Sequence, residues 1–143
     1  MSDTFEKKVV FITGGSAGIG AALGHEFARQ GARVALAARS QERLDEVVAS
    51  IEAEGGDAMG VLCDVTSRES LDAAVATVIE QWGQLDVSVA NAGFGVSGFM
   101  QRLTTEDYRR QLDTNVFGLV DTIYATLPHL LESHGRVVLI SSV

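Results

Sequence analysis

The sequence has few of the residues that several classes of protein depend on. Its one cysteine, Cys63, cannot form an internal disulfide bond. Its only lysines are Lys7 and Lys8, and the net charge is −8, so the clustered basic surface of a nucleic-acid-binding protein is missing. No apolar run is long enough to span a membrane, and the first residues have neither the basic nor the apolar segment of a signal peptide. We therefore expect a cytoplasmic protein with no membrane span and no nucleic-acid partner.

The composition is otherwise that of an ordinary globular protein. Hydrophobic residues make up 46% of the 143 residues and charged residues 21%. We see no linker, internal repeat or low-complexity segment, so we predict one domain over residues 1–143. The acidic balance favours a small ligand over a polyanion, and no metal-binding set of side chains is predicted.

Short apolar runs alternate with helical patterns along the chain. The runs are nearly continuous in apolar character, which is typical of strands that helices cover on both faces. This alternation predicts an α/β fold, a doubly wound parallel sheet of at least five strands in a three-layer α/β/α arrangement. The predicted strands are Lys8 to Thr13, Arg33 to Ala38, Ala58 to Cys63, Leu85 to Ala90 and Arg136 to Ser141.

Four helices are predicted between these strands. Thr66 and Thr104 are expected N-caps, each with an acidic residue three positions later, while Gly31, Gly55, Gly56 and Gly83 fit helix ends. The fourth helix is expected to run from about Thr105 to about Ser133, with a kink at Pro128 and a close backbone approach at Gly118. The expected buried faces are Ile19, Leu23 and Phe27; Leu44, Val47, Val48 and Ile51; Leu71, Val75, Val78 and Trp82; and Leu112, Val116, Val120, Ile123 and Leu127.

A glycine-rich turn joins the first strand to the first helix. Gly14, Gly18 and Gly20 lie in Thr13-Gly14-Gly15-Ser16-Ala17-Gly18-Ile19-Gly20, a G-x-x-x-G-x-G spacing that differs from the usual G-x-G-x-x-G. Such a turn presents backbone N–H groups at the positive end of a helix and can hold a phosphate without a basic side chain. A P-loop is excluded because no Gly-Lys-Ser/Thr follows. A tight turn without a ligand is the alternative.

Three further motifs extend this pattern. Ala90-Asn91-Ala92-Gly93 follows the fourth strand, Asn115 lies in the long helix, and Ile140-Ser141-Ser142 ends the fifth strand. With the glycine turn, and over the whole length given, the chain resembles a classical short-chain dehydrogenase/reductase, a Rossmann-like oxidoreductase family. Ala90 departs from the family, in which Asn is frequent at that place.

The resemblance implies a nicotinamide dinucleotide cofactor. It places the pyrophosphate on the turn formed by Gly14, Ser16, Ala17, Gly18, Ile19 and Gly20, and the cofactor above Asn91, Ala92 and Gly93. It places adenine near Asp64 and Val65, although Asp64 fits equally well as a turn or capping carboxylate.

The choice between NAD and NADP depends on the end of the second strand. A carboxylate there binds a ribose 2′-hydroxyl, whereas an arginine binds a 2′-phosphate. The residues are Ala38, Arg39 and Ser40, with no carboxylate, so we predict NADP(H), with NAD as the alternative. Arg39 as a solvated residue near a helix start is the other interpretation.

Catalysis in the family resembles a relay of Asn, Ser, Tyr and Lys. Asn115 matches the asparagine, which fixes a water, and Ser142 matches the serine, which orients the substrate oxygen, with Ser141 as its neighbour. The Tyr-x-x-x-Lys pair is absent, since neither Tyr108 nor Tyr124 has a lysine four residues later. His25, His129 and His134 fit structural or solvated positions better than catalytic ones.

The sequence therefore leaves two functions open. The first is an NADP-dependent oxidoreductase that acts on a small-molecule carbonyl or secondary alcohol, with these residues as the retained part of a longer enzyme and no turnover by them alone. The second is a non-catalytic dinucleotide-binding module or subunit. The apolar segment from Phe94 to Met100 weakly favours a hydrophobic substrate. The family's four-helix contact implies a homo-oligomer, a dimer or tetramer, and the fifth strand is expected to leave an open apolar edge.

Overall fold

The computed structural model describes residues 4–142, and residues 1–3 and 143 of the predicted domain lie outside this range. Five parallel strands form one sheet in the order β3-β2-β1-β4-β5. The strands are β1 (Val9–Thr13), β2 (Arg33–Ala38), β3 (Asp57–Leu62), β4 (Val87–Ala90) and β5 (Arg136–Leu139). Each overlaps a predicted strand, so the doubly wound α/β fold is confirmed.

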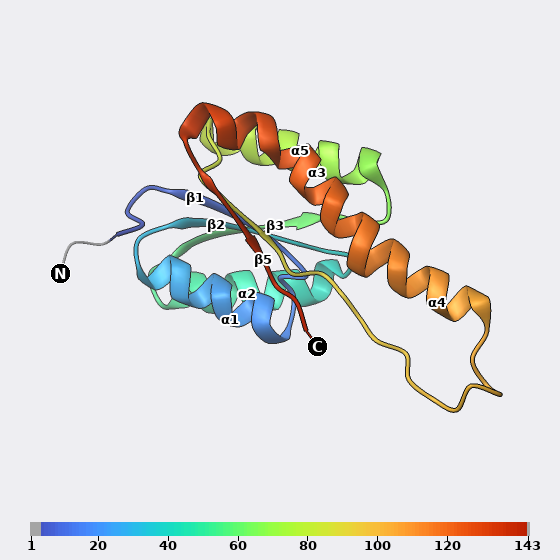
Figure 1. The fold of residues 1–143 in the computed structure, drawn as a ribbon. Helices are drawn as coiled ribbons and strands as arrows, with labels where there is room; N and C mark the ends of the chain where they lie inside the picture. The colour runs from blue at the N-terminus through green and yellow to red at the C-terminus, as the bar shows by residue number, and fades with distance from the viewer. Residues whose placement is uncertain (1–3, 143) are drawn as a thin grey trace.

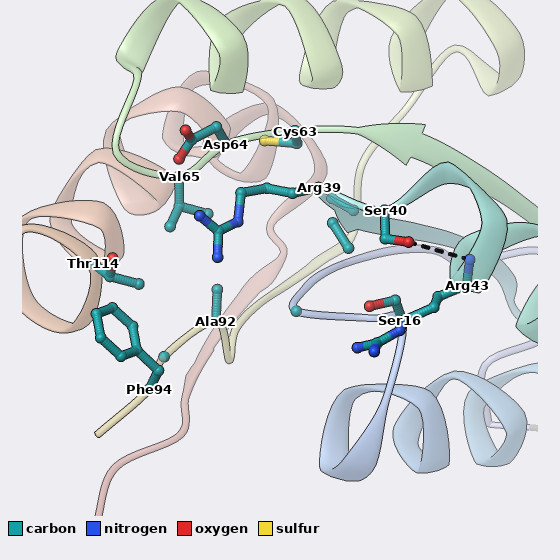
Figure 2. A pocket seen from close by; sticks show the side chains of 14 residues that line it. Ser16, Arg39, Ser40, Arg43, Cys63, Asp64, Val65, Ala92, Phe94 and Thr114 are labelled. Carbon is teal, nitrogen blue, oxygen red and sulfur yellow. Dashed lines mark hydrogen bonds between the residues drawn. The ribbon is translucent and has the colours of Figure 1, made fainter. Parts of the chain in front are cut away.

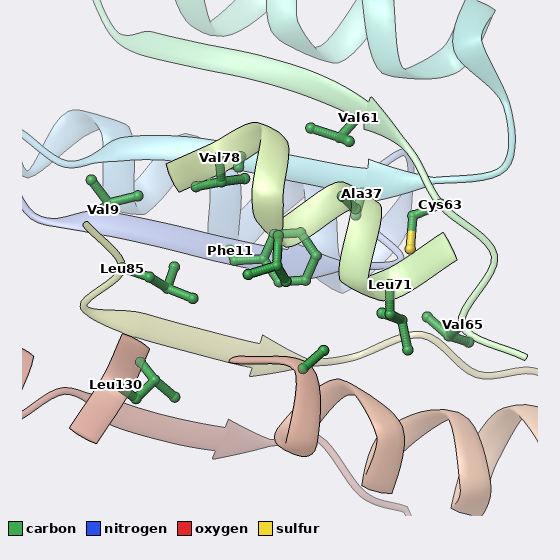
Figure 3. Packing of buried hydrophobic residues seen from close by; sticks show 14 residues of the cluster. Val9, Phe11, Ala37, Val61, Cys63, Val65, Leu71, Val78, Leu85 and Leu130 are labelled. Atoms are coloured by element: carbon green, nitrogen blue, oxygen red, sulfur yellow. The ribbon is translucent and has the colours of Figure 1, made fainter. Parts of the chain in front are cut away.

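Helices cover both faces of the sheet (Figure 1). One face carries α1 (Gly18–Arg29) and α2 (Gln41–Ala53), and the other carries α3 (Arg68–Trp82) and α5 (Gly118–Ser133). Two apolar clusters fill the spaces between the layers, and Figure 3 shows the cluster beneath α3 and α5, which is centred on Phe11, Leu71 and Leu85. The strand order reverses between β1 and β4, and at such a switch point the turns that follow the two strands enclose a crevice.

The caps follow the local sequence closely. Thr104 caps α4 (Thr105–Leu112) in a reciprocal capping box with Asp107, as predicted. The predicted cap Thr66 is wrong by one residue, because the Ser67 hydroxyl accepts the Ser70 N–H at the start of α3, while Thr66 bonds to Asp64. Gly31, Gly55 and Gly83 have positive φ angles of 87°, 87° and 75° just beyond helix ends, where glycine is the least strained residue.

The long helix differs from the prediction in its geometry. Residues Asp113–Phe117 form a π-helical turn, η1, between α4 and α5, so the predicted α-helix is interrupted at Asn115. Pro128 lies inside α5, which continues to Ser133. A π-turn inserts one residue into the helical repeat and thereby rotates the side chains on either side of it relative to one another.

The predicted buried faces of two helices are wrong in part, although Leu23 and Phe27 of α1 are partly buried and pack against the core. In α1 the residues buried against the sheet are Gly20, Gly24 and Ala28, while Ile19 is 60% exposed. In α5 they are Gly118, Thr122, Ala125, Thr126 and Leu130. Leu112, Val116 and Val120 face outward instead. Small residues let these helices approach the sheet closely, and periodicity based on large apolar residues does not detect them.

Candidate nucleotide-binding site

The glycine turn after β1 leaves the N-terminus of α1 open. Ala17 is the N-cap of α1 and provides no side-chain hydrogen bond to the first turn. A Cβ on Gly18 would meet no atom within 4 Å, whereas a Cβ on Gly20 would collide with the Gly14 carbonyl oxygen. Gly18 therefore borders open space and Gly20 closes the turn. Backbone N–H groups without a capping side chain, at the positive end of a helix, form a site that suits a phosphate.

The buried Thr13 hydroxyl joins this turn to the turn after β4. It accepts the backbone N–H groups of Asn91 and Ala92 at 3.0 and 3.1 Å and donates to the Val89 carbonyl at 3.4 Å. The Asn91 side chain donates in return to the carbonyls of Thr13 and Gly14 at 3.1 and 3.3 Å. Hydrogen bonds thus hold the glycine turn and the Asn-Ala-Gly turn together at the switch point of the sheet.

A first cavity of about 340 Å³ lies beside the ends of β2 and β3 (Figure 2). Arg39 and Ser40 from the end of β2 and Arg43 from the first turn of α2 line it. Figure 2 shows the Arg39 side chain pointing into the cavity and the Arg43 side chain extending toward Ser16 of the glycine turn. The Ser40 hydroxyl accepts the Arg43 backbone N–H at 3.4 Å. Two guanidinium groups and two hydroxyl groups therefore belong to residues that line the same cavity.

Asp64 and Val65 line the same cavity from the end of β3. One Asp64 carboxylate oxygen accepts both the hydroxyl and the backbone N–H of Thr66, at 2.7 and 3.0 Å. These two bonds lower the pKa of Asp64, and the charge of Arg39 adds a smaller effect in the same direction. The geometry is that of a turn-forming carboxylate with its second oxygen left for other contacts. The neighbouring Cys63 is buried, which raises the pKa of its thiol.

A second cavity of about 910 Å³ lies on the other side of the Asn-Ala-Gly turn. It brings together groups that are far apart in sequence: Gly14, Ala17, Gly18 and Ile19 of the glycine turn, Asn91, Ala92 and Gly93 after β4, Gln111 of α4, Asn115 of η1, and Ser141 and Ser142 after β5. Every residue predicted for the site lines one of these two cavities except Gly20, which supports the turn from behind. Both cavities open at the carboxyl ends of the strands.

Asn115 clamps the backbone of the loop after β4. Its side-chain oxygen accepts the Phe94 N–H at 3.0 Å, and its side-chain nitrogen donates to the Phe94 carbonyl at 2.7 Å. Gln111, one turn earlier, accepts the Val96 N–H at 3.1 Å. The two amide side chains thus bind alternate residues of an extended segment in the way a neighbouring strand would. The Asn115 carboxamide is occupied by these bonds, so its part in fixing a water stays a prediction.

The histidines lie outside both cavities. His25 of α1 approaches the Glu54 carboxylate at 3.4 Å, and His134 ends α5 with a positive φ of 53°. Within residues 4–142, no three or more histidine, cysteine or acidic side chains are grouped to hold a metal ion. Over that same range no helix has the length and apolar character needed to cross a bilayer.

Comparison with known proteins identifies the family. The family model described as short chain dehydrogenase matches residues 8–143. The chain belongs to the short-chain dehydrogenase family. This establishes a nucleotide-binding, Rossmann-like oxidoreductase relationship and confirms the resemblance drawn from the glycine turn, the Asn-Ala-Gly turn, Asn115 and Ser142.

Individual relatives of this short-chain dehydrogenase agree with the assignment. It is 36% identical over 141 residues to an uncharacterised oxidoreductase of Listeria monocytogenes, covering 98% of this chain and 57% of that protein. It is also similar to a crystallised alcohol dehydrogenase of the archaeon Thermococcus sibiricus complexed with 5-hydroxy-NADP, with 35% identity, a TM-score of 0.89, and coverage of 94% of this chain and 57% of that chain. A short-chain dehydrogenase/reductase of Burkholderia phymatum in complex with NAD has 27% identity and a TM-score of 0.92, and the match covers 96% of this chain and 50% of that chain. The chain thus spans about half the length of these relatives, and the two solved structures are complexes with 5-hydroxy-NADP and with NAD.

The structure places at the site several residues of this short-chain dehydrogenase that sequence reasoning did not assign to it, among them Thr13, Ser40, Arg43, Gln111 and Thr114. One signal was available for Arg43. A cation in the first turn of a helix opposes the helix dipole, and this unfavourable placement suggests an anionic partner. Gln111 had no comparable signal, because its partner Val96 lies in an irregular loop.

Proposed function

We propose that this protein is an NADP(H)-dependent oxidoreductase that transfers hydride between the nicotinamide and a carbonyl or secondary alcohol. The observation that carries the NADP preference is the pair Arg39 and Arg43, which lines the first cavity where β2 ends and α2 begins. No carboxylate stands between Ala38 and Gln41, so no acidic side chain there is available for a ribose 2′-hydroxyl.

The physical basis of the preference is charge. A 2′-phosphate carries close to two negative charges, and two guanidinium groups with the hydroxyls of Ser16 and Ser40 suit it in charge and in hydrogen bonding. A hydrogen bond to a charged group contributes about 1.5–3 kcal/mol, so losing one corresponds to a fall in affinity of roughly ten- to a hundredfold. Asp64 opposes this field, but its charge is partly satisfied by Thr66.

The rest of the dinucleotide is accommodated by the N-terminus of α1, the end of β3 and the second cavity. The uncapped N-terminus of α1, beside the open space at Gly18, suits the pyrophosphate, and Val65 and Asp64 suit the adenine. The nicotinamide end would then lie in the second cavity above Asn91, Ala92 and Gly93. A bound nicotinamide dinucleotide supplies or takes up the hydride.

Asn115 and Ser142 are the proposed catalytic-site residues of this chain. Both line the second cavity, where the resemblance to the family assigns the serine to orienting the substrate oxygen. The acid and base that the family takes from a Tyr-x-x-x-Lys pair do not occur within these 143 residues. We therefore expect the 143-residue polypeptide to bind cofactor without turnover, and the cytoplasmic location stays a prediction.

We further propose that the protein forms a homo-oligomer through the outer face of its long helix. Leu112, Val116, Val120 and Tyr124 follow one another at four-residue spacing, and each is between 38% and 57% exposed. Phe117 adds a side chain that is 59% exposed. A continuous apolar stripe of this kind on a helix favours burial against a second helix. The helical contact of the family makes a second copy of the chain the proposed partner.

The cofactor proposal is tested by titrating the protein with NADPH and with NADH. We expect tighter binding of NADPH, and we expect Arg39→Ala or Arg43→Ala to weaken NADPH binding about tenfold or more while leaving NADH binding nearly unchanged. Arg29→Ala is the matched control, because it removes the same charge from α1, outside the two site cavities. Equal affinities for the two cofactors, or an unchanged NADPH affinity in Arg39→Ala, would refute the preference. Binding without turnover of any carbonyl substrate by the whole natural polypeptide would favour the non-catalytic module instead.

A further inference from the structure

The contact between Gly118 and Val65 couples the long helix to the wall of the first cavity. Gly118 is buried at the start of α5, directly after the π-turn. A Cβ at Gly118 would lie 2.8 Å from Val65 Cγ2 and 3.1 Å from the Val65 carbonyl oxygen. Val65 is 8% exposed and lines the first cavity. Helix and loop therefore touch at a place where a single added methyl group has no room.

Both sides of this contact are held in place. On the loop side, the Asp64 N–H donates to the Ser70 hydroxyl at 2.9 Å and the Ser67 N–H donates to the Asp64 carbonyl at 3.0 Å. On the helix side, Arg68 of α3 approaches the Asp121 carboxylate of α5 at 3.8 Å. A methyl group at position 118 must displace one of the two, because it would lie too close to both the side chain and the carbonyl oxygen of Val65.

Either displacement changes the same cavity. Val65 forms one wall, and Thr114 of the π-turn, four residues before Gly118, forms another (Figure 2). If the loop yields, Val65 moves into the cavity, and if the helix yields, Thr114 moves away from it. The absence of a side chain at position 118 therefore sets the width of the cavity at the end that we assign to adenine.

We propose that Gly118 is a positioning residue for cofactor binding, one that sets the adenosine subsite through Val65 and Thr114 without touching the nucleotide. The inference rests on the proposed function, since it assumes that the first cavity holds the adenosine end of NADP(H). Gly118 then positions the cavity wall, and the π-turn beside it places Thr114 at the cavity.

The test uses adenosine 2′,5′-bisphosphate, a probe that carries only the adenosine end and the 2′-phosphate. Gly118→Ala is expected to weaken binding of this probe about tenfold, and to weaken NADPH binding by the same factor because the lost contacts belong to the shared half. Adding Val65→Ala removes the closest clash, so the double variant is expected to bind more tightly than Gly118→Ala alone.

Gly56→Ala is the matched control for overpacking. A Cβ there would lie 2.6 Å from Ile51 Cγ2 and 3.0 Å from Ala28 Cβ, away from the nucleotide cavities. We expect it to lower the thermal midpoint but to change the affinity for the probe less than twofold. If Gly118→Ala does not fold, the double variant is compared with Val65→Ala alone and is expected to bind the probe more weakly, because the tight contact with the Val65 carbonyl remains.

Three results would overturn the inference. The first is that Gly118→Ala binds the probe with an affinity within twofold of the wild-type affinity, or that it lowers this affinity no more than Gly56→Ala does. The second is that the double variant binds the probe with the same affinity as Gly118→Ala or, if Gly118→Ala does not fold, with the same affinity as Val65→Ala. The third is a wild-type protein that binds neither the probe nor NADPH, which overturns the proposed function and this inference together.

Discussion

The Thr13 hydroxyl provides a sharp test of how the site is held together. Replacing Thr13 with valine keeps the shape of the side chain but removes the acceptor for the Asn91 and Ala92 N–H groups. Leaving a buried donor unpaired costs about 1–3 kcal/mol, and both residues are half-buried, so we expect Thr13→Val to lower the free energy of unfolding by roughly 2–4 kcal/mol. A domain of this size is typically stable by about 5–15 kcal/mol, so the variant should still fold.

Urea denaturation, followed by circular dichroism and by the fluorescence of Trp82, measures this loss. With a slope of about 1–3 kcal/mol per molar urea, the midpoint should fall by roughly 1 M or more. Thr122→Val is the matched control, because Thr122 is equally buried and its hydroxyl only donates to the Gly118 carbonyl within its own helix, at 2.7 Å. We expect the control to lose less than about 1 kcal/mol.

Thr13→Ser keeps the hydroxyl and should recover most of the loss, apart from about 0.8 kcal/mol for the missing methyl group. Thr13→Val should also weaken NADPH binding, because the two turns that we propose lie beneath the cofactor lose the hydroxyl that links them. A Thr13→Val variant whose stability lies within about 0.5 kcal/mol of Thr122→Val would refute this account of the site.

Three further predictions concern other contacts. The Thr66 hydroxyl is the largest cause of the lowered pKa of Asp64, so Thr66→Val should raise that pKa toward the ordinary value of 3.8 in a carbon-NMR titration. Since the folded pKa lies below the unfolded one, Asp64 stabilises the fold at pH values above about 3.8, and this contribution is lost as the pH falls through the folded pKa. Gln111→Leu should speed amide hydrogen exchange at Val96, whereas Gln111→Glu keeps the acceptor and should preserve protection. Val116→Glu should shift the protein toward monomer in sedimentation equilibrium, because it places a charge in the apolar stripe.

Each of these has a control and a contradicting result. An Asp64 pKa that stays low in Thr66→Val would mean that the backbone bond alone accounts for the shift. Gln81→Leu, at an exposed position of α3, should leave amide hydrogen exchange at Val96 unchanged. If Gln81→Leu speeds this exchange as much as Gln111→Leu does, Gln111 does not hold the loop. Leu62→Glu alters an exposed apolar residue of β3 outside the long helix, and its effect on self-association should be smaller than that of Val116→Glu.

The strands were predictable because each is a continuous apolar run. Burial on both faces of a parallel sheet favours such runs, and β1 and most of β2 are buried in this way. The strands β1, β2 and β3 begin and end within a residue of their predicted bounds. The glycine turn was predictable for a related reason, because it depends on backbone conformations that few residue types adopt. Gly14 and Gly18 have positive φ angles of 64° and 53°.

The orientation of the helices was not predictable from the same patterns. Periodicity marked Ile19 and Val116 as buried, yet the buried residues of α1 and α5 are glycine, alanine and threonine, apart from Leu130. Close helix–sheet packing selects small side chains, and the large apolar ones beside them are left for a ligand cavity or a partner. Ile19 accordingly lines the second cavity.

The sequence alone thus determined the positions of the strands, the glycine turn and the membership of an oxidoreductase family, because each depends on local composition and short-range spacing. Only the tertiary structure placed Arg43 in the same cavity as Arg39, Gln111 against Val96 and Gly118 against Val65. These pairings depend on how far apart helices and loops lie in space and on one inserted residue in a π-turn. No local pattern encodes such distances, since the packing of the whole sheet and its two helical layers sets them.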